Sequence, residues 1–242
     1  MKEVTICYIG GGSQEWAVKL MRDLALEEGL TGELRLYDID RKAVETNLQL
    51  GRALFANRRV KSRFTVVGRE RLPEALDGSD IVVLSIEPGP TELRYADLEI
   101  PEKHGIEQTV GDTVGPGGIL RAWRAIPTFV EFGEAIAKHA PAAWIINYTN
   151  PMTLCTAAIY QGFSRAKCVG CCHEVPEMQR YVGRFIAERE LGEVGDPHEV
   201  DIEVAGVNHF TFASRISWKG IDLLEELRRF AAEPESFDDL RD

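Results

Sequence analysis

The chain of 242 residues is 44% hydrophobic and 28% charged, and its net charge at pH 7 is −11. This composition is typical of a globular protein that can bury a sizeable core, and it excludes collagen-like and low-complexity chains. The acidic balance argues against nucleic-acid partners and anionic membrane surfaces, because both need a basic face. No apolar run approaches the roughly 20 residues that a membrane-spanning helix requires.

Cysteine usage and the first residues of the chain indicate the compartment. The five cysteines are an odd number and are unevenly spread, which does not suit a disulfide framework. The segment MKEVTICYIGGGS enters a strand-like run directly and lacks the features of a secretory signal. We therefore expect a cytoplasmic protein whose thiols are reduced.

Short apolar segments alternate with amphipathic segments of helical length along most of the chain. The pattern predicts strands at 4–9, 34–37, 64–67, 81–85, 144–146 and 167–170. Helices are predicted in the intervals and after the last strand, at 15–26, 41–55, 92–103, 119–138, 152–161 and 174–191. This alternation favours an α/β fold with a doubly wound, Rossmann-like and mostly parallel sheet.

The pattern changes after residue 195. Segments 199–205 and 210–216 alternate apolar and polar residues, as half-buried antiparallel strands do. A helix-like stretch at 221–233 and an acidic tail at 234–242 follow. We predict a doubly wound domain at 1–195 and the beginning of a second, α+β domain at 196–242.

The segment IGGGSQE after the first predicted strand is the first candidate for binding. Gly10 and Gly12 have the spacing of a dinucleotide-binding loop, whose backbone N–H groups approach a pyrophosphate. The third glycine position is Glu15, so a plain glycine-rich turn is an equal alternative for this segment alone. Asp38 ends the second predicted strand, where an acid binds ribose hydroxyls and repels a 2′-phosphate. Together these features predict an NAD site, although a solvated acid at a strand end is the alternative.

Three later loops carry polar groups. VVLSIEPGP (82–90) and QTVGDTVGPGG (108–118), which contains Asp112, are either ligand-binding loops or flexible connections. NYTNPM (147–152) follows the fifth predicted strand, and its amides, tyrosine and hydroxyl suit the recognition of sugar hydroxyls. An Asx-turn before the proline is the structural alternative.

A cysteine and a histidine from separate segments are candidate metal ligands. GCCHEVPEMQ (170–179) places Cys172 beside His173 at the start of a predicted helix, and GVNHF contributes His209. A structural cysteine is the alternative, but Cys172 and His209 together would leave coordination positions open, as a catalytic metal needs. If both bind one ion, we predict that the sulfur and a ring nitrogen lie within roughly 4 to 5 Å of each other.

Six motifs in this order resemble those of glycoside hydrolase family 4, the NAD- and metal-dependent glycosidases. They are GGGS, YDID, QTVGDTVGPGG, NYTNPM, CCHEV and GVNHF, and they cover nearly the whole chain. The CHEV tetrad is unlike the branches that act on 6-phosphorylated glycosides and is similar to the α-glucosidase and α-galacturonidase branches. GGGSQEW, the doubled cysteine and NHFTF resemble the α-galacturonidases most.

The resemblance implies a role for each matching position. NAD would be held by Gly10, Gly12, Ser13 and Asp38. A divalent ion, usually Mn²⁺, would be bound by Cys172 and His209. Sugar hydroxyls would contact Asn150, and the catalytic candidates are His173, toward substrate or leaving group, and Asp112.

The chemistry that the resemblance implies is oxidation at C3 of the sugar, metal-assisted elimination, addition of water and re-reduction, so that NAD is recycled. A uronate substrate would need one arginine, for which the candidates are Arg94, Arg121 and Arg124. The alternatives are an α-glucosidase of the same family, an NAD-dependent 2-hydroxy acid dehydrogenase and an NAD-binding module without enzymatic activity.

The length of the chain departs from the family. Members are nearly twice as long, they form homo-oligomers, and their base tyrosine lies in a part with no counterpart here. Tyr148 and Tyr160 belong to other motifs. Either the sequence is a fragment or the protein lacks part of the active site. We expect a fragment of a longer, homo-oligomeric protein that acts on a small glycoside.

Overall fold

The structure is a computed structural model that describes residues 2–108 and 111–232. The predicted acidic tail at 234–242 and residues 109 and 110 of the glycine-rich loop lie outside the described residues. The chain divides into two compact units, Met1–Cys171 and Cys172–Asp242, which we call the N-terminal and C-terminal units. No helix in the described part of the chain is long and apolar enough to cross a membrane.

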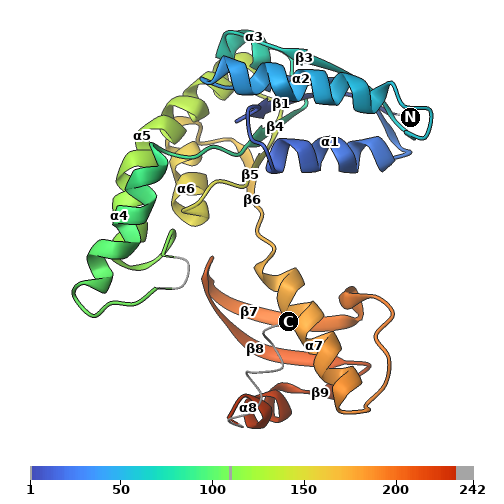
Figure 1. The fold of residues 1–242 in the computed structure, drawn as a ribbon, viewed down its shortest axis with the longest axis vertical. Coiled ribbons are helices and arrows are strands. Elements are labelled where there is room, and N and C mark those ends of the chain that lie inside the picture. The colour runs from blue at the N-terminus through green and yellow to red at the C-terminus, as the bar shows by residue number, and fades with distance from the viewer. Residues whose placement is uncertain (1, 109–110, 233–242) are drawn as a thin grey trace. The chain divides into compact units, whose positions relative to one another are not determined.

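The N-terminal unit is built on a six-stranded parallel sheet, which confirms the predicted doubly wound fold (Figure 1). The strands follow the order β3-β2-β1-β4-β5-β6, so the order reverses between β1 and β4. The carboxyl ends of the strands at such a reversal form the edge where ligands bind. The strands are β1 (Lys2–Ile9), β2 (Leu30–Tyr37), β3 (Arg63–Gly68), β4 (Ile81–Leu84), β5 (Trp144–Asn147) and β6 (Lys167–Gly170).

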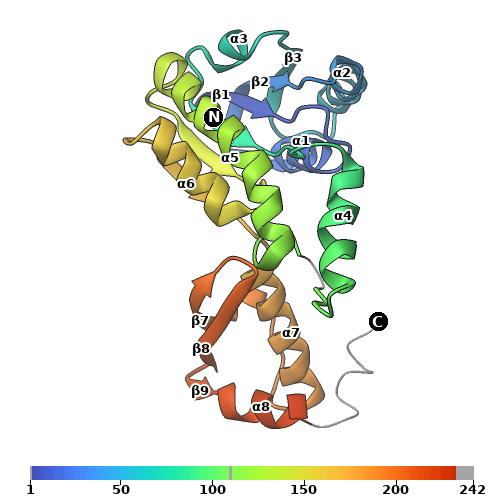
Figure 2. The ribbon, with the colours of Figure 1, turned by 90° about the vertical axis from the view of Figure 1, so that its left-hand side faces the viewer.

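Helices cover both faces of this sheet (Figure 2). On one face lie α1 (Trp16–Leu26) and α2 (Arg41–Phe55), and on the other lie α3 (Leu72–Leu76), α5 (Gly115–His139) and α6 (Met152–Gly162). The remaining helix, α4 (Thr91–Glu102), packs against α5. Alternate residues of β1 enter the two cores, since Ile6 and Tyr8 pack with α1 and α2, whereas Cys7 and Ile9 pack with α5 and α6.

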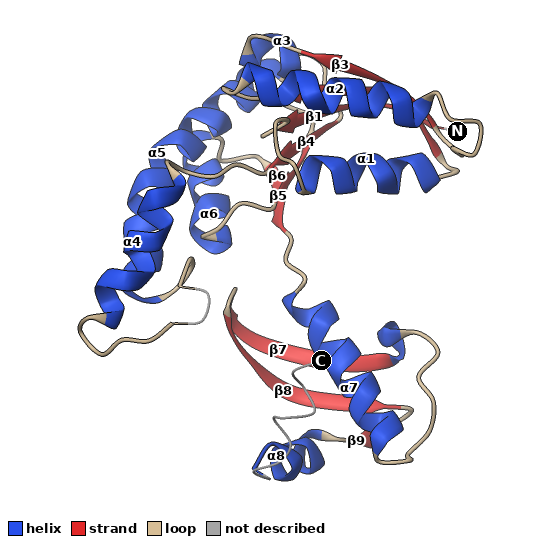
Figure 3. Ribbon diagram, in the orientation of Figure 1, coloured by secondary structure: helices blue, strands red, loops and turns tan. Residues whose placement is uncertain are grey.

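The C-terminal unit combines helices with a three-stranded antiparallel sheet of order β7-β8-β9 (Figure 3). Its core contains Val182 and Ile186 of the first helix together with Val200, Ile216 and Trp218 of the sheet. The elements are α7 (Glu174–Glu188), η1 (Pro197–Glu199), β7 (Val200–Val207), β8 (Phe210–Trp218), β9 (Ile221–Asp222) and α8 (Leu224–Ala232). The predicted strand pair and the α+β character of this part are thus present.

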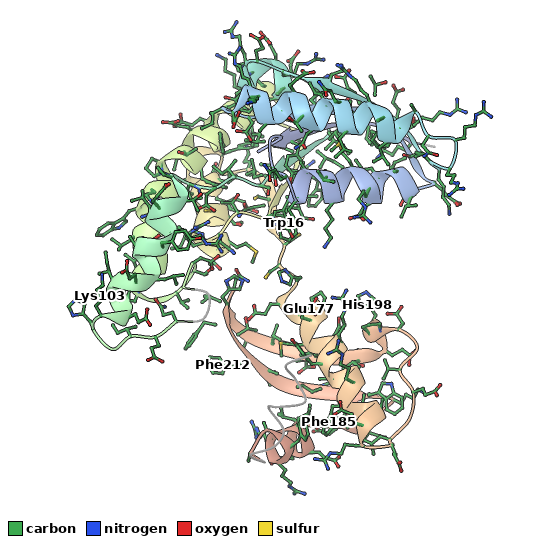
Figure 4. The ribbon with its side chains drawn as sticks, viewed as in Figure 1. Trp16, Lys103, Glu177, Phe185, His198 and Phe212 are labelled. Atoms are coloured by element: carbon green, nitrogen blue, oxygen red, sulfur yellow. The ribbon has the colours of Figure 1, made fainter. Side chains whose placement is uncertain are left out.

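The division between the units falls at Cys171, whereas the sequence pattern placed the domain boundary at residue 195. The difference is α7, which the pattern assigned to the doubly wound domain. The apolar face of α7 packs on the antiparallel sheet. The ring centroids of Phe185, which Figure 4 labels, and Phe230 in α8 are 5.2 Å apart. Helical periodicity reveals that a face is apolar, but it does not reveal which sheet that face covers.

Candidate active site

The predicted dinucleotide loop lies between β1 and α1, at the carboxyl edge of the parallel sheet. Gly10 has a φ of 99°, and a Cβ at this position would lie 1.8 Å from the carbonyl oxygen of Ser85. Both features require glycine. The amides of Gly10 and Gly11 both donate to the carbonyl of Tyr37 at 2.9 Å, so the loop is tied to the end of β2.

Asp38, directly after β2, is hydrogen-bonded to this loop. One carboxylate oxygen accepts a hydrogen bond from the Gly12 amide at 3.0 Å, and the other accepts from the Asp40 amide at 3.0 Å. A Cβ on Gly12 would lie 3.0 Å from the same Asp38 oxygen, so glycine permits this close approach. A carboxylate has about four lone-pair sites, so these two bonds leave capacity for ribose hydroxyls.

Two other side chains fix the loop. The Ser13 hydroxyl accepts from the Trp16 amide at 3.0 Å, at the start of α1 (Figure 4 labels Trp16). Asn47, buried in α2, donates through Nδ2 to the carbonyls of Gly11 and Ser13, both at 2.8 Å. Asn47 was not among the predicted site residues, although a polar residue on the buried stripe of an amphipathic helix is a signal that could have found it.

Asp112 and Asn150 are brought together within the N-terminal unit. The Asn150 amide donates to Asp112 Oδ2 at 2.9 Å, and the Thr113 hydroxyl donates to Asp112 Oδ1 at 3.1 Å. Asp112 is only 7% exposed, so these hydrogen bonds replace the water that its carboxylate loses on burial. The carbonyl of Asn150 accepts from Arg121 Nε at 3.0 Å, which extends the cluster to α5.

The Asx-turn considered for NYTNPM is formed by its first asparagine. Asn147 is fully buried, and its Oδ1 accepts from the Thr149 amide at 2.9 Å. Its Nδ2 also lies within hydrogen-bond distance of the Met152 carbonyl. The structural alternative therefore describes Asn147, whereas the side chain of Asn150 is directed to Asp112.

The three arginines considered for a substrate carboxylate differ in their surroundings. Arg121 is buried and lies 2.8 Å from a carboxylate oxygen of Glu87. Arg124 forms an ion pair with the buried Asp97, and Arg94 is exposed on α4. Since Arg121 and Arg124 already bind carboxylates of the protein, a uronate would have to compete with these partners.

The two predicted metal ligands meet within the C-terminal unit. Cys172 Sγ lies 3.5 Å from His209 Nε2, and both residues are partly exposed. With bonds of about 2.3 Å to sulfur and 2.1 Å to nitrogen, two ligands of one tetrahedral ion lie about 3.6 Å apart. The observed separation fits such an ion and lies within the predicted limit of roughly 4 to 5 Å.

His209 occupies the two-residue turn between β7 and β8 with a φ of 61°. This left-handed conformation is uncommon for a residue with a side chain and is concentrated at functional sites. The neighbouring Asn208 is 9% exposed, and its Oδ1 has no hydrogen-bond partner among the residues that the structure describes. A buried oxygen of this kind fits a turn that receives a cation or its water.

Few other ligating side chains surround the pair. Within residues 2–108 and 111–232 there is no group of three or more His, Cys, Asp or Glu that could hold a metal ion. An ion held by Cys172 and His209 would therefore keep positions open for substrate oxygens or water. His173 directly precedes α7 with an exposed side chain, and its role toward substrate stays a prediction.

The remaining thiols and Tyr148 are unsuited to proton transfer near neutral pH. Burial raises the pKa of Cys7 and Cys155 to about 12 and that of Cys168 to about 11. Burial is also the largest cause that raises the pKa of Tyr148, with contributions from nearby Cys171 and Asp23. A phenol with a raised pKa is almost entirely protonated near neutral pH, so Tyr148 is a poor general base.

Comparisons with known proteins bear on the whole chain. A family model described as Family 4 glycosyl hydrolase matches residues 5–188. The chain is 47% identical to an alpha-galacturonidase of Thermoanaerobacterium saccharolyticum, over 94% of this chain and 49% of that protein. It is 43% identical to an alpha-galacturonidase of Bacillus subtilis, over 96% of this chain and 51% of that protein. The chain thus spans about half the length of these curated relatives.

Among solved structures, the chain is similar to a 6-phospho-beta glucosidase from Thermotoga maritima determined with manganese, NAD⁺ and glucose-6-phosphate. The TM-score is 0.76 and the sequence identity is 25%, over 95% of this chain and 52% of that one. The likeness extends through both compact units, since it covers nearly all of the chain.

Proposed function

The chain belongs to glycosyl hydrolase family 4, and on this premise we propose that the whole protein is a glycosidase that depends on NAD and a divalent metal. Its proposed substrate is an unphosphorylated α-glycoside, with an α-galacturonide preferred. The observation that carries the proposal is the identity of 43% and 47% to alpha-galacturonidases over more than nine-tenths of the chain.

The N-terminal unit would bind NAD. The loop of Gly10 and Gly12 would let the pyrophosphate approach the backbone at the start of α1, where Ser13 accepts from the Trp16 amide. Asp38 would accept hydrogen bonds from the ribose hydroxyls and repel the 2′-phosphate of NADP. When bound, NAD and the metal would supply reversible hydride acceptance at C3 of the sugar and Lewis acidity toward its oxygens.

Cys172 and His209 would hold the divalent ion, with Mn²⁺ as the first candidate from the Thermotoga maritima structure. Their separation of 3.5 Å supports this assignment. Asn150 would offer its Oδ1 to a sugar hydroxyl while Asp112 accepts from its Nδ2 and fixes the orientation of the amide. His173 would contact the substrate or assist the leaving group.

The proposal also covers the compartment and the oligomeric state of the protein. All five cysteines are free thiols, and a thiolate ligand would require reducing conditions, so we place the protein in the cytoplasm. The whole protein, about twice as long as this chain, would form a homo-oligomer, and its further residues would supply the base.

The test is a comparison of kcat/KM for three substrates on the whole protein with Mn²⁺, NAD⁺ and a thiol. We expect the α-galacturonide to be cleaved fastest, the α-glucoside more slowly and a 6-phosphoglucoside hardly at all. A lead for the 6-phospho substrate would contradict the substrate assignment. Stoichiometric release of NADH from a 2-hydroxy acid, without glycoside cleavage, would replace the glycosidase by the dehydrogenase alternative.

A further inference from the structure

Glu174 connects the two proposed metal ligands. It lies two residues after Cys172, in the first turn of α7, and is partly buried. Its Oε2 accepts hydrogen bonds from the backbone amide of His209 at 3.2 Å and from the hydroxyl of Thr211 at 3.0 Å. The Asn208 amide also donates to this oxygen, at 3.5 Å. One short segment therefore carries one ligand and the anchor of the turn that carries the other.

The turn lies at an exposed end of the β7–β8 hairpin. The flanking residues Val207 and Phe210 are 44% and 57% exposed, so core packing does not fix the end of the hairpin. His209 adopts a φ of 61°, a conformation that costs on the order of 1 kcal/mol or more and persists only where the surroundings enforce it. The hydrogen bonds to Glu174 contribute to that enforcement.

We propose that Glu174 is a positioning residue that fixes the β7–β8 turn so that the imidazole of His209 faces the sulfur of Cys172. The inference rests on the proposed metal site. Glu174 acts through the backbone of the turn rather than as a third ligand, because the described residues contain no group of three or more His, Cys, Asp or Glu that could hold a metal ion and its Oε2 accepts from donors of three residues. A neutral acceptor of the same shape should therefore preserve the role.

The experiment is a Co²⁺ titration of the 242-residue chain, followed by the thiolate-to-metal absorption of cobalt. The variants are Glu174→Ala, Glu174→Gln and Cys172→Ala. The matched control is Glu177→Ala, which lies in the same first helical turn and forms an ion pair with the exposed Arg180 (Figure 4 labels Glu177). We expect Glu174→Ala to weaken Co²⁺ binding about 10- to 100-fold, the usual effect of removing a group that orients a ligand. Glu174→Gln should stay much closer to the unmutated chain, and Glu177→Ala should match it.

Hydrogen exchange of the His209 amide in the absence of metal provides a second measurement. The amide should exchange faster in Glu174→Ala than in the unmutated chain, and Glu174→Gln should restore its protection. Equal Co²⁺ affinity in Glu174→Ala and the unmutated chain would overturn the role of Glu174 alone. An equal loss in Glu174→Gln would mean that charge or ligation matters, and would overturn it too. Absence of a Cys172-dependent band in the unmutated chain would overturn the metal site itself.

Discussion

At the residue scale, Asp38 illustrates how one carboxylate serves both the fold and a ligand. Asp38→Ala removes the acceptor of the Gly12 amide and the proposed acceptor of the ribose hydroxyls. We expect NAD affinity to fall about ten-fold or more, because hydrogen bonds to a charged group are worth about 1.5 to 3 kcal/mol. Discrimination against NADP should weaken as well, and calorimetric titration with both cofactors measures the two effects.

Asp38→Asn separates these contributions. The amide keeps an oxygen that can accept from Gly12, but it lacks the charge that repels a 2′-phosphate. We expect the loop to stay ordered and the preference for NAD over NADP to shrink. Equal affinity of the unmutated chain for the two cofactors would contradict this assignment of Asp38.

Thiol reactivity should divide the cysteines into two groups. Cys7, Cys155 and Cys168 are buried with raised pKa values, whereas Cys171 and Cys172 are partly exposed. Because the thiolate is the reactive form, we expect a thiol reagent to label two of the five cysteines in the native chain and all five after denaturation. Co²⁺ should protect Cys172, and rapid native labelling of a third thiol would contradict the observed burial.

The same burial predicts a loss of stability at alkaline pH. Burial raises the pKa of Cys7 and Cys155 from 9.0 to about 12, so between these values the folded chain keeps protons that the unfolded chain releases. The free energy of unfolding should therefore fall as the pH rises from about 9 toward 12. Thermal unfolding across this range measures the slope, and Cys7→Ala should make it shallower.

At the scale of elements, the β1–α1 loop depends on glycine for two separable reasons. Gly10 and Gly78 both have positive φ, of 99° and 66°, but a Cβ at Gly78 would meet nothing within 4 Å. Gly78→Ala should cost only about 1 to 2 kcal/mol of left-handed backbone strain. Gly10→Ala adds a clash with the Ser85 carbonyl and should be clearly more destabilising and impair NAD binding. Urea unfolding of both variants makes the comparison, and equal costs would contradict the close approach.

How much of the fold the sequence predicts depends on how regular each element is. The helix 41–55 and the strand 167–170 are predicted at their observed bounds, because their apolar periodicity is clear. The five-residue helix α3 and the two-residue strand β9 are too short to show a period and were missed. The partner of α7 was also beyond prediction, because it depends on tertiary packing.

The candidate site follows the same division. Cys172 and His209 could be proposed from their chemical type and motif, and the structure brings them to 3.5 Å. Asn47 and Glu174 act on loops more than 30 residues away in the chain, so their hydrogen bonds become visible only when the elements are packed. Residues with recognisable chemistry are thus predictable, whereas residues that position them require the structure.

At the scale of the whole molecule, the proposed chemistry is divided between the two units. The residues proposed for NAD, with the Asn47 that fixes their loop, all lie in Met1–Cys171. The proposed metal ligands and Glu174 all lie in Cys172–Asp242, which has a core of its own. The hydrogen bonds of Asp38 and Asn47 to the dinucleotide loop join residues of the N-terminal unit, and those of Glu174 to the β7–β8 turn join residues of the C-terminal unit.

This division predicts that the two binding activities can be removed one at a time. Cys172→Ala should abolish the cobalt–thiolate band but leave NAD affinity nearly unchanged, because the hydrogen bonds of Asp38 and Asn47 that hold the dinucleotide loop do not involve Cys172. Asp38→Ala should weaken NAD binding and leave Co²⁺ affinity intact, because the amides that Asp38 binds, those of Gly12 and Asp40, are not part of the proposed metal site. Titrating each variant with both ligands measures all four affinities. A large loss of NAD affinity in Cys172→Ala would show that the metal ligand also supports the dinucleotide, and the two sites would then have to be treated as one.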